Sequence, residues 1–367
     1  MNFNDLFLKS FRILLLPFAI IYGFIVSVRN YLYNTNKLIS VTFNFPIICV
    51  GNLAVGGTGK SPMVEYLIRL LKDDYAIATL SRGYKRKTKG YVLASNKTTA
   101  LEIGDEPMQF HLKFPEIAVA VGEERIVAIP HLLQDKPNLQ AIILDDAFQH
   151  REINAGINIL LTEYENRFTK DFFLPTGDLR DEQCAYKRAQ IIVVTKCPSD
   201  LSEAKKIEIL YEIHPWPGQQ VFFTTLAYSQ PYHIFHREKT SDITEAVEVL
   251  LVCGIANPKP LKDYLLQNAK TYYQITFDDH HIFNIDDLNN IKNKFNEIDE
   301  PNKIIITTEK DAVRFLKFSS ELQYIPIYVL PIEHQFLFEE GNEFNKAVKS
   351  YIINHYKKQP HVKIKKK

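Results

Sequence analysis

The stretch Ile47-Ile-Cys-Val-Gly-Asn-Leu-Ala54-Val-Gly-Gly-Thr-Gly59-Lys60-Ser61 joins an apolar run to a glycine-rich loop, and a helical pattern follows from Pro62. This strand, loop and helix context is the one in which a P-loop binds phosphate. Backbone N–H groups of the loop would surround phosphate oxygens at the positive end of the helix, although alanine replaces the usual first glycine. Lys60 would reach the β- and γ-phosphates, and Ser61 would ligate magnesium. The stretch therefore predicts a site for ATP and Mg²⁺, with a glycine-rich turn and a solvated lysine as the alternative. The predicted nucleotide-binding residues are Ala54, Val55, Gly56, Gly57, Thr58, Gly59, Lys60 and Ser61.

The segments around this stretch alternate short apolar runs with helical patterns. Each run is nearly continuous in apolar character, as expected for parallel strands that helices cover on both faces. Such repetition predicts an α/β fold, a doubly wound parallel sheet like that of P-loop NTPases. The expected strands are Pro46 to Val50, Tyr75 to Leu80, Ile117 to Val121, Ala141 to Leu144, Ile157 to Leu161 and Ile191 to Val194.

The length of 367 residues exceeds the size at which one hydrophobic core usually stops growing, so a second, smaller α/β domain is expected. Its strands should lie in Glu248 to Cys253, Thr271 to Thr276, Lys303 to Thr307 and Ile325 to Val329, and its helices in Pro258 to Ala269 and Glu343 to His355. We expect a helix in residues 1–40, the nucleotide-binding and catalytic domain in 41–220, a two-stranded linker in 221–238, the smaller domain in 239–357 and a basic tail in 358–367.

An uncharged segment from Ile13 to Val28 lies between Arg12 and Arg29 near the N-terminus. As a helix it would be about 24 Å long, whereas a hydrocarbon core is about 30 Å thick, and Pro17 shortens it further. We therefore expect a peripheral or monotopic helix that contacts a membrane surface. A buried core helix and a secretory signal peptide are the alternatives, but no clear small-residue cleavage site follows.

The bulk composition is that of an ordinary globular protein, with a formal net charge of +1, which gives no overall attraction to nucleic acid. Cys49, Cys184, Cys197 and Cys253 lie far apart and form no CxxC pair. Free thiols in a reducing, cytoplasmic compartment are therefore expected. We infer no obligate protein partner from the sequence.

A pair of carboxylates, Asp145 and Asp146, follows the apolar run Ala141 to Leu144. A buried strand that delivers a carboxylate beside a P-loop is typical of a Walker B element, so both residues are candidate magnesium ligands. Gln149 and His150 crowd the same strand end, where ligands bind in open α/β sheets, and are candidate substrate contacts. A helix-capping turn is the alternative for the paired aspartates.

A phosphorylated hydroxyl needs a group that orients and deprotonates it, and Gly104-Asp105-Glu106-Pro107 supplies carboxylates between the P-loop and the Walker B strand. Asp105 is the candidate base, and Glu106 is a candidate substrate contact. An N-cap is an equally good reading of this aspartate from sequence alone. Asp279-His280-His281 supplies imidazoles, with an exposed loop as the alternative.

Several cations follow strands of the nucleotide domain. An anionic substrate, or the charge that develops in phosphoryl transfer, would explain them as well as a solvated face would. The cations are Arg82, Lys85, Arg86, Arg125 and Arg180, of which Arg82 is a candidate substrate contact and Arg125 and Arg180 are candidate catalytic residues.

Six motifs in order resemble the tetraacyldisaccharide 4'-kinase family of lipid A biosynthesis and span nearly the whole chain. They are Gly51-Asn-Leu with Gly-Gly-Thr-Gly-Lys-Ser61, Ser81-Arg-Gly-Tyr, Gly104-Asp-Glu-Pro, Asp145-Asp-Ala-Phe-Gln-His-Arg, Phe277-Asp-Asp-His-His and Thr307-Thr-Glu-Lys-Asp-Ala-Val-Arg. Two positions depart from the family pattern. Ala147 stands where glycine is common, and Asp181 stands where glutamate is common; neither removes a group that the chemistry needs.

The resemblance implies transfer of the ATP γ-phosphate to the 4'-hydroxyl of tetraacyldisaccharide 1-phosphate, giving lipid IVA at the cytoplasmic face of the bacterial inner membrane. It implies that Asp105 is the general base, assisted by a histidine that best matches His280. Lys60, Ser61 and a Walker B aspartate would serve ATP and magnesium. Thr307 to Asp311, including Lys310 and Asp311, would close over the nucleotide as the two domains approach.

A P-loop GTPase that acts as a switch or metallochaperone is the alternative from another class. Val193-Val-Thr195-Lys196 is similar to a guanine-reading element, but Pro198 stands where that element needs aspartate. A membrane scaffold with a degenerate nucleotide site is a third alternative.

Overall fold

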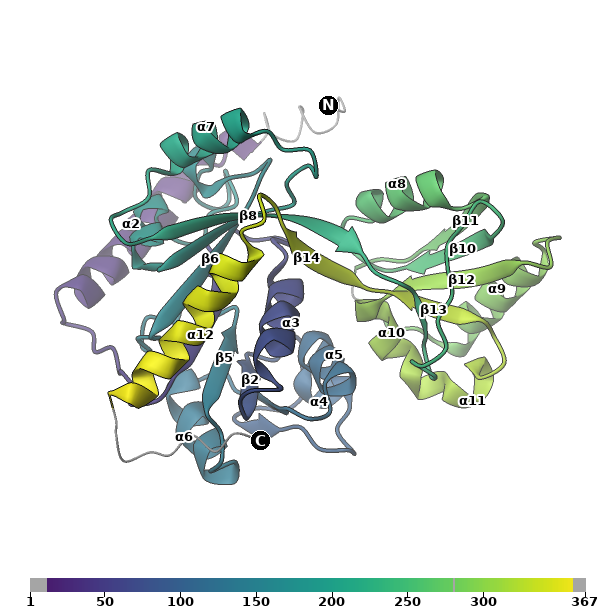
Figure 1. The fold of residues 1–367 in the computed structure, drawn as a ribbon, viewed down its shortest axis with the longest axis horizontal. Helices are drawn as coiled ribbons and strands as arrows, with labels where there is room; N and C mark the ends of the chain where they lie inside the picture. Colours follow the sequence, from purple (N-terminus) through teal and green to yellow (C-terminus); the bar gives the residue numbers. More distant parts are fainter. Residues whose placement is uncertain (1–11, 280, 359–367) are drawn as a thin grey trace.

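The computed structural model describes residues 12–279 and 281–358 and contains two sheets (Figure 1). The strands of the larger sheet are β1 (Ile47–Asn52), β2 (Ile77–Ser81), β3 (Val92–Leu93), β4 (Ala118–Val121), β5 (Ala141–Asp145), β6 (Ile157–Glu163), β7 (Ile191–Thr195), β8 (Gln220–Tyr228) and β14 (Ile332–Phe336). Their order is β14-β8-β7-β6-β1-β5-β2-β4-β3, and the pairs β14–β8 and β3–β4 are antiparallel while the other neighbours are parallel. The predicted α/β fold with a parallel sheet is confirmed.

Helices cover both faces of this sheet. Successive residues of each buried strand point to opposite sides, so each strand contributes to the core on either face. In β1, Ile48 and Val50 face α3 (Lys60–Leu71), α5 (Asp105–Lys113) and α12 (Gly341–Lys357). Ile47 and Cys49 face α6 (Arg125–Asp135) and α7 (Glu203–Ile213). The near-continuous apolar character of the strands follows from this two-sided burial.

The smaller sheet is a second α/β unit. It contains β9 (Tyr232–His233), β10 (Glu248–Cys253), β11 (Thr271–Thr276), β12 (Lys303–Thr308) and β13 (Ile327–Leu330), in the order β11-β10-β12-β13-β9. One core holds α8 (Lys259–Asn268), and the core on the other face holds α9 (Ile285–Asn296), α10 (Glu309–Phe315) and α11 (Ser319–Leu322). Shorter elements elsewhere are α4 (Ala100–Ile103) and the 3₁₀ turns Phe168–Lys170, Gln183–Arg188 and Leu316–Phe318.

The chain returns to the larger sheet after it has built the smaller one, and here the structure differs from the expected division. β8, expected in a linker, pairs with both β7 and β14, and β8 and β14 form a ribbon that points toward the second unit (Figure 1). α12, expected in the smaller domain, buries Phe344, Val348 and Ile352 beside α3. Apolar periodicity specifies which face of a helix is buried but not the sheet that it packs against.

The apolar N-terminal segment forms α2 (Leu16–Asn34), which by length and composition alone could cross a membrane. Only 28% of its most apolar window is buried in the protein, so α2 is not the buried core helix considered above. Ala19, Gly23, Val26, Asn30 and Tyr33 form its buried face. The large apolar side chains that it exposes are Leu16, Phe18, Ile20, Ile21, Phe24, Ile25, Val28 and Tyr31.

Candidate active site

The glycine-rich loop, residues 53–59, joins the end of β1 to the start of α3 at the carboxyl edge of the larger sheet. Gly56 (φ 112°) and Gly59 (φ 85°) have left-handed backbone angles that favour glycine. A Cβ atom built on Gly56 or Gly57 would meet no described atom within 4 Å, so this part of the loop is open. Val55 differs, because its N–H already donates to the Asp178 carbonyl at 2.8 Å. Phosphate oxygens can therefore approach the second half of the loop.

Lys60 lies in a polar cluster with the end of the Walker B strand. Its Nζ donates to Asn52 Oδ1 at 3.3 Å and lies 3.8 Å from Asp146 Oδ1. Arg180 reaches the same two groups, at 2.5 Å from Asn52 Oδ1 and 2.8 Å from Asp146 Oδ1. Burial alone would raise the pKa of Asp146, but Lys60 and Arg180 hold it below its ordinary value. The structure thus brings the predicted lysine, arginine and aspartate together.

Asp145 is buried beside this cluster. Its Oδ2 accepts from Ser81 Oγ at 3.3 Å, while its Oδ1 has no hydrogen-bond partner among the described residues. Burial, with the nearby charges of Glu106 and Asp146, raises the pKa of Asp145 to about 7. A buried carboxylate oxygen without a partner among the described residues, on a carboxyl whose pKa is raised by burial, suits a ligand of a cation.

The residues here fit magnesium together with a nucleotide better than a metal alone. The described part of the chain contains no group of three or more His, Cys, Asp or Glu side chains that could hold a metal ion. Magnesium commonly takes one or two protein ligands and completes its shell with phosphate oxygens and water. Ser61 Oγ donates to Glu106 Oε1 at 3.2 Å, so Glu106, a predicted substrate contact, lies beside the predicted metal ligand Ser61.

Arg125 begins α6 and is almost fully buried. Its Nη1 donates to the carbonyls of Gly122 and Glu123 at 2.8 and 3.2 Å, whereas its Nε and Nη2 have no partner within the described residues. Burial lowers the pKa of Arg125 to about 10. Burial and the charges of Arg125 and Arg82 lower the pKa of His150 to about 4, so this histidine is neutral. Two unsatisfied N–H groups in a positive environment suit an anionic group of a ligand.

Asp105 is the first residue of α5, and Gly104 holds the N-cap position, so the capping alternative does not describe it. Arg314 of α10 donates to Asp105 Oδ2 from Nε at 3.2 Å and from Nη2 at 2.6 Å. The Nη1 atom of the same arginine donates to Asp311 Oδ1 at 3.2 Å. An ion pair between the two α/β units therefore fixes the candidate base. His280, the predicted assistant, lies outside the described residues.

The other predicted site residues have different surroundings. Gln149 donates to the Asn52 carbonyl at 2.6 Å, so its amide supports the end of β1. Lys310 pairs with Asp279 at 2.9 Å. Asp311 is fully buried and accepts from the Gly254 N–H at 2.9 Å and Thr308 Oγ1 at 2.7 Å, so it holds together the loops of the second unit. Arg82 is exposed.

The polar side chains of α2 attach this helix to the loops that carry the site. Tyr22 donates to the Arg180 carbonyl at 3.1 Å, and Asn30 donates to Asp181 Oδ1 at 2.7 Å. Arg29 donates to the Gln149 carbonyl at 2.8 Å. The exposed apolar face of α2 therefore has a fixed position relative to Arg180.

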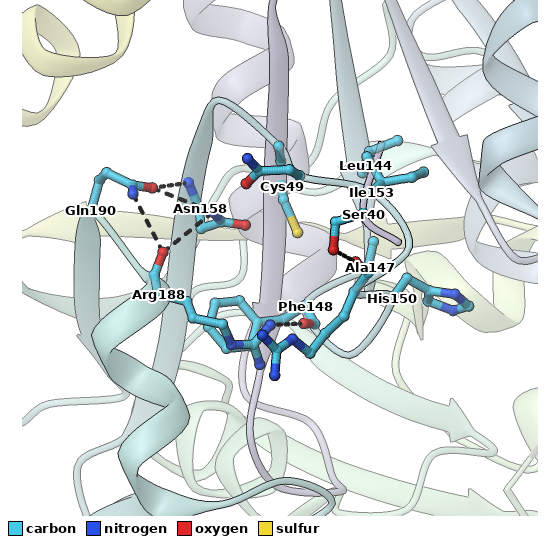
Figure 2. A pocket seen from close by; sticks show the side chains of 13 residues that line it. Ser40, Cys49, Leu144, Ala147, Phe148, His150, Ile153, Asn158, Arg188 and Gln190 are labelled. Atoms are coloured by element: carbon cyan, nitrogen blue, oxygen red, sulfur yellow. Dashed lines mark hydrogen bonds between the residues drawn. The ribbon is translucent and has the colours of Figure 1, made fainter. Parts of the chain in front are cut away.

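A cavity of about 220 Å³ lies behind the turn that follows β5. Figure 2 shows Arg188 donating to the Phe148 carbonyl at its edge, at 2.9 Å, and Cys49 on its wall. Burial raises the pKa of Cys49 to about 12, so this thiol is unreactive near neutral pH. Of the predicted substrate contacts, His150 lines this cavity.

Three side chains that contact predicted site residues were not predicted from the sequence: Asn52, Ser81 and Arg314. All three lie in the six family motifs, but the order of motifs does not reveal that Asn52 binds a lysine across a loop or that Arg314 binds an aspartate 209 residues away. Ser81 ends β2 and reaches the neighbouring strand's Asp145, which only the strand order reveals.

Comparison with known proteins finds one family over most of the chain. The sequence profile of the tetraacyldisaccharide-1-P 4'-kinase family matches residues 11–352. A tetraacyldisaccharide 4'-kinase of Flavobacterium johnsoniae is 47% identical over 343 residues, which cover 93% of this chain and 97% of the relative. That of Bacteroides thetaiotaomicron is 43% identical and covers 92% of each. Among solved structures, LpxK from Aquifex aeolicus in complex with ATP matches with a TM-score of 0.73 and 28% identity, over 93% of this chain and 99% of that one.

Proposed function

The chain belongs to the tetraacyldisaccharide 4'-kinase family, and from that membership we propose the reaction and the roles of its residues. It is a phosphotransferase of lipid A biosynthesis that uses ATP. It transfers the γ-phosphate to the 4'-hydroxyl of tetraacyldisaccharide 1-phosphate, which gives lipid IVA. The observation that carries this proposal is the approach of the P-loop lysine, Lys60, to 3.8 Å from Asp146 at the end of the Walker B strand.

Ser61 and Asp145, with Asp146, would hold the magnesium ion, which when bound neutralises charge between the β- and γ-phosphates. Asp145 Oδ1, which has no hydrogen-bond partner in the part of the chain that the structure describes, supports this role. Lys60 supplies a positive charge to the transferred phosphoryl group, and Arg180 and Arg125 supply two more. Arg125 is suited to this because burial keeps its Nε and Nη2, which have no partner among residues 12–279 and 281–358, away from bulk water.

Asp105 would accept the proton of the 4'-hydroxyl as general base. Its neighbour Glu106 contacts Ser61, so the start of α5 lies against the predicted metal side of the P-loop. Arg314 holds the Asp105 carboxylate from the second unit, which makes the position of the base depend on the approach of that unit. His280 is the proposed assistant, as the family resemblance implies.

We further propose that α2 lies on the cytoplasmic face of the inner membrane. Its exposed side carries Phe18, Ile20, Ile21, Phe24 and Ile25, each about 60–70% exposed. Its other side is hydrogen-bonded to the active-site loops, so insertion to the depth of one helix face would place Arg180 near the lipid headgroups. A lipid substrate could then present its sugar without leaving the bilayer.

The test of the proposed function is transfer from labelled ATP to a panel of acylated glucosamine disaccharides. Purified protein should label tetraacyldisaccharide 1-phosphate, and Asp105→Asn should lose most turnover while ATP binding is kept. Absence of transfer to every acceptor, together with hydrolysis of GTP, would instead support a GTPase. One contact argues against the GTPase alternative. Lys196, in the stretch that is similar to a guanine-reading element, forms an ion pair with Glu163 at 2.6 Å.

A further inference from the structure

We infer that His334 and Thr195 are positioning residues for ATP: they hold the second half of the P-loop from behind, and His334 ties it to the ribbon that leads to the second unit. This inference rests on the proposed function only in requiring that the loop bind a nucleotide triphosphate. His334 lies in none of the motifs of the sequence, and Thr195 lies only in the stretch that is similar to a guanine-reading element.

His334 is buried on β14, and both of its ring nitrogens have partners. Nε2 lies 2.9 Å from the Gly59 carbonyl, and Nδ1 lies 2.9 Å from Thr224 Oγ1. A carbonyl oxygen can only accept, so Nε2 carries the proton and Nδ1 of the neutral ring accepts from the Thr224 hydroxyl. Burial lowers the pKa of His334 to about 4, which agrees with a neutral ring. The imidazole is thus fixed in one tautomer and one orientation.

The contact reaches the loop at the residue before the P-loop lysine. The Gly59 carbonyl also accepts the Met63 N–H at 3.1 Å, the first hydrogen bond of α3, and the histidine therefore uses its second lone pair. Carbonyl and N–H point in opposite directions across a trans peptide. Because the Gly59 carbonyl points at β14, the Lys60 N–H of the same peptide points to the open side of the loop.

Thr195, at the end of β7, holds the preceding peptide in the same way. Its fully buried hydroxyl donates to the Thr58 carbonyl at 2.9 Å, and its longer contact to the Thr162 carbonyl is 3.3 Å. The Gly59 N–H shares its peptide with the Thr58 carbonyl and is turned to the ligand side. Two consecutive N–H groups at the positive end of α3 are thereby aimed where phosphate would lie.

The glycine at position 59 is explained by the same contact. A Cβ atom there would lie 3.0 Å from His334 Nε2, and the φ of 85° already disfavours a side chain. A side chain at this position would therefore require the His334 ring to shift by a few tenths of an ångström.

His334 also connects the loop to the second unit. β14 pairs with β8 from Ile332 to Phe336, and only Pro331 separates it from β13 of the smaller sheet. Thr224, which fixes the imidazole, lies on β8. Both strands of the ribbon therefore hold the imidazole that supports the loop.

The experiment compares ATP affinity, measured directly by titration, with the steady-state KM for ATP, kcat and the KM for the lipid acceptor. His334→Phe removes both nitrogens, and Thr195→Val removes the hydroxyl at nearly constant volume. Each should weaken ATP binding and raise the KM for ATP about 5–10-fold, the value of one buried hydrogen bond. The acceptor KM should change less than about twofold, because the lost hydrogen bond, worth about 1 kcal/mol, supports the P-loop and not the acceptor.

Conservative variants separate positioning from general support of the fold. His334→Gln keeps a donor for the Gly59 carbonyl and Thr195→Ser keeps the hydroxyl, so both should retain ATP affinity. Glu333→Gln is the control on the same strand, since it breaks only the partly exposed pair with Arg69 at 3.3 Å.

Folded His334→Phe and Thr195→Val proteins with unchanged ATP affinity would overturn the inference, as would equal losses in the conservative variants. If the His334→Phe substitution prevents folding, Thr195→Val and the two conservative variants decide. Direct ATP titration works without acceptor, so failure of the proposed reaction is detected separately.

Discussion

Replacing Arg314 by methionine should separate the position of the candidate base from the binding of ATP. In the native structure this arginine donates twice to Asp105 Oδ2, and both side chains are mostly buried, at 8% and 20% exposure. Hydrogen bonds to a charged group contribute about 1.5–3 kcal/mol each. If positioning of the base uses about 2 kcal/mol of this, kcat should fall about 30-fold, since about 1.36 kcal/mol is tenfold in rate.

The assay is kcat at saturating ATP and acceptor, normalised to the concentration of ATP-binding sites. Normalisation is needed because the variant also removes a donor from Asp311 Oδ1, so some protein will unfold. Arg237→Ala removes an exposed arginine from the same unit and should leave kcat unchanged. Arg314→Lys keeps the positive charge but loses the paired guanidinium donors, so its kcat should lie between those of the Arg314→Met and Arg237→Ala proteins. An Arg314→Met protein that binds ATP and turns over within about twofold of the native rate would refute the reasoning, because loss of a charged hydrogen bond should cost more than that.

Three further predictions concern the loop, the membrane helix and pH. Lys60→Ala should weaken ATP binding by about tenfold or more, because one charge-assisted contact to phosphate is lost, and calorimetric titration checks this. Ile21→Asp combined with Phe24→Asp should reduce binding to anionic vesicles by at least about tenfold in a flotation assay, whereas Leu266→Asp, an equally exposed position on α8, should not. Acidification should destabilise the protein through His334, whose folded pKa of about 4 lies below its ordinary 6.5. The stability that this histidine contributes is present above about pH 6.5 and is lost as pH falls, by about 2 kcal/mol between pH 6.5 and 5. Urea unfolding of His334→Gln should show a correspondingly smaller loss, and equal losses would count against a neutral buried ring.

The sequence predicted most of what depends on local pattern. The apolar runs became strands close to their expected bounds, because parallel strands buried on both faces have little choice of register or face. The family resemblance and the parallel α/β fold are confirmed by the comparisons. The roles of Asp105, Lys60 and the paired aspartates stay predictions, although the structure brings Lys60 and Asp146 together.

What the sequence could not show depends on contacts between distant segments. The pairing of Arg314 with Asp105 and of His334 with Gly59 spans 209 and 275 residues, and a lone arginine or histidine has many possible partners. The sheet against which α12 packs was not predicted for a related reason, because its apolar face could be buried against either sheet. Asp311 stays a predicted nucleotide contact, and its hydrogen bond with the Gly254 N–H was not predicted, because an aspartate at a helix N-terminus can bind nearby backbone as readily as a ligand.

The late return of β14 and α12 to the larger sheet has a consequence for synthesis of the chain on the ribosome. The smaller unit is built from consecutive strands and helices between β9 and β13, so it can fold as it emerges. The P-loop sheet must meanwhile wait, with β8 as an open edge until β14 has been made and with the surface that Phe344 and Val348 cover still bare until α12 follows. At ordinary elongation rates the wait from Tyr228 to Ile332 is roughly 5 to 20 seconds. During that interval the nascent chain presents an unpaired strand and a bare apolar surface, the two features that chaperones recognise and that promote aggregation.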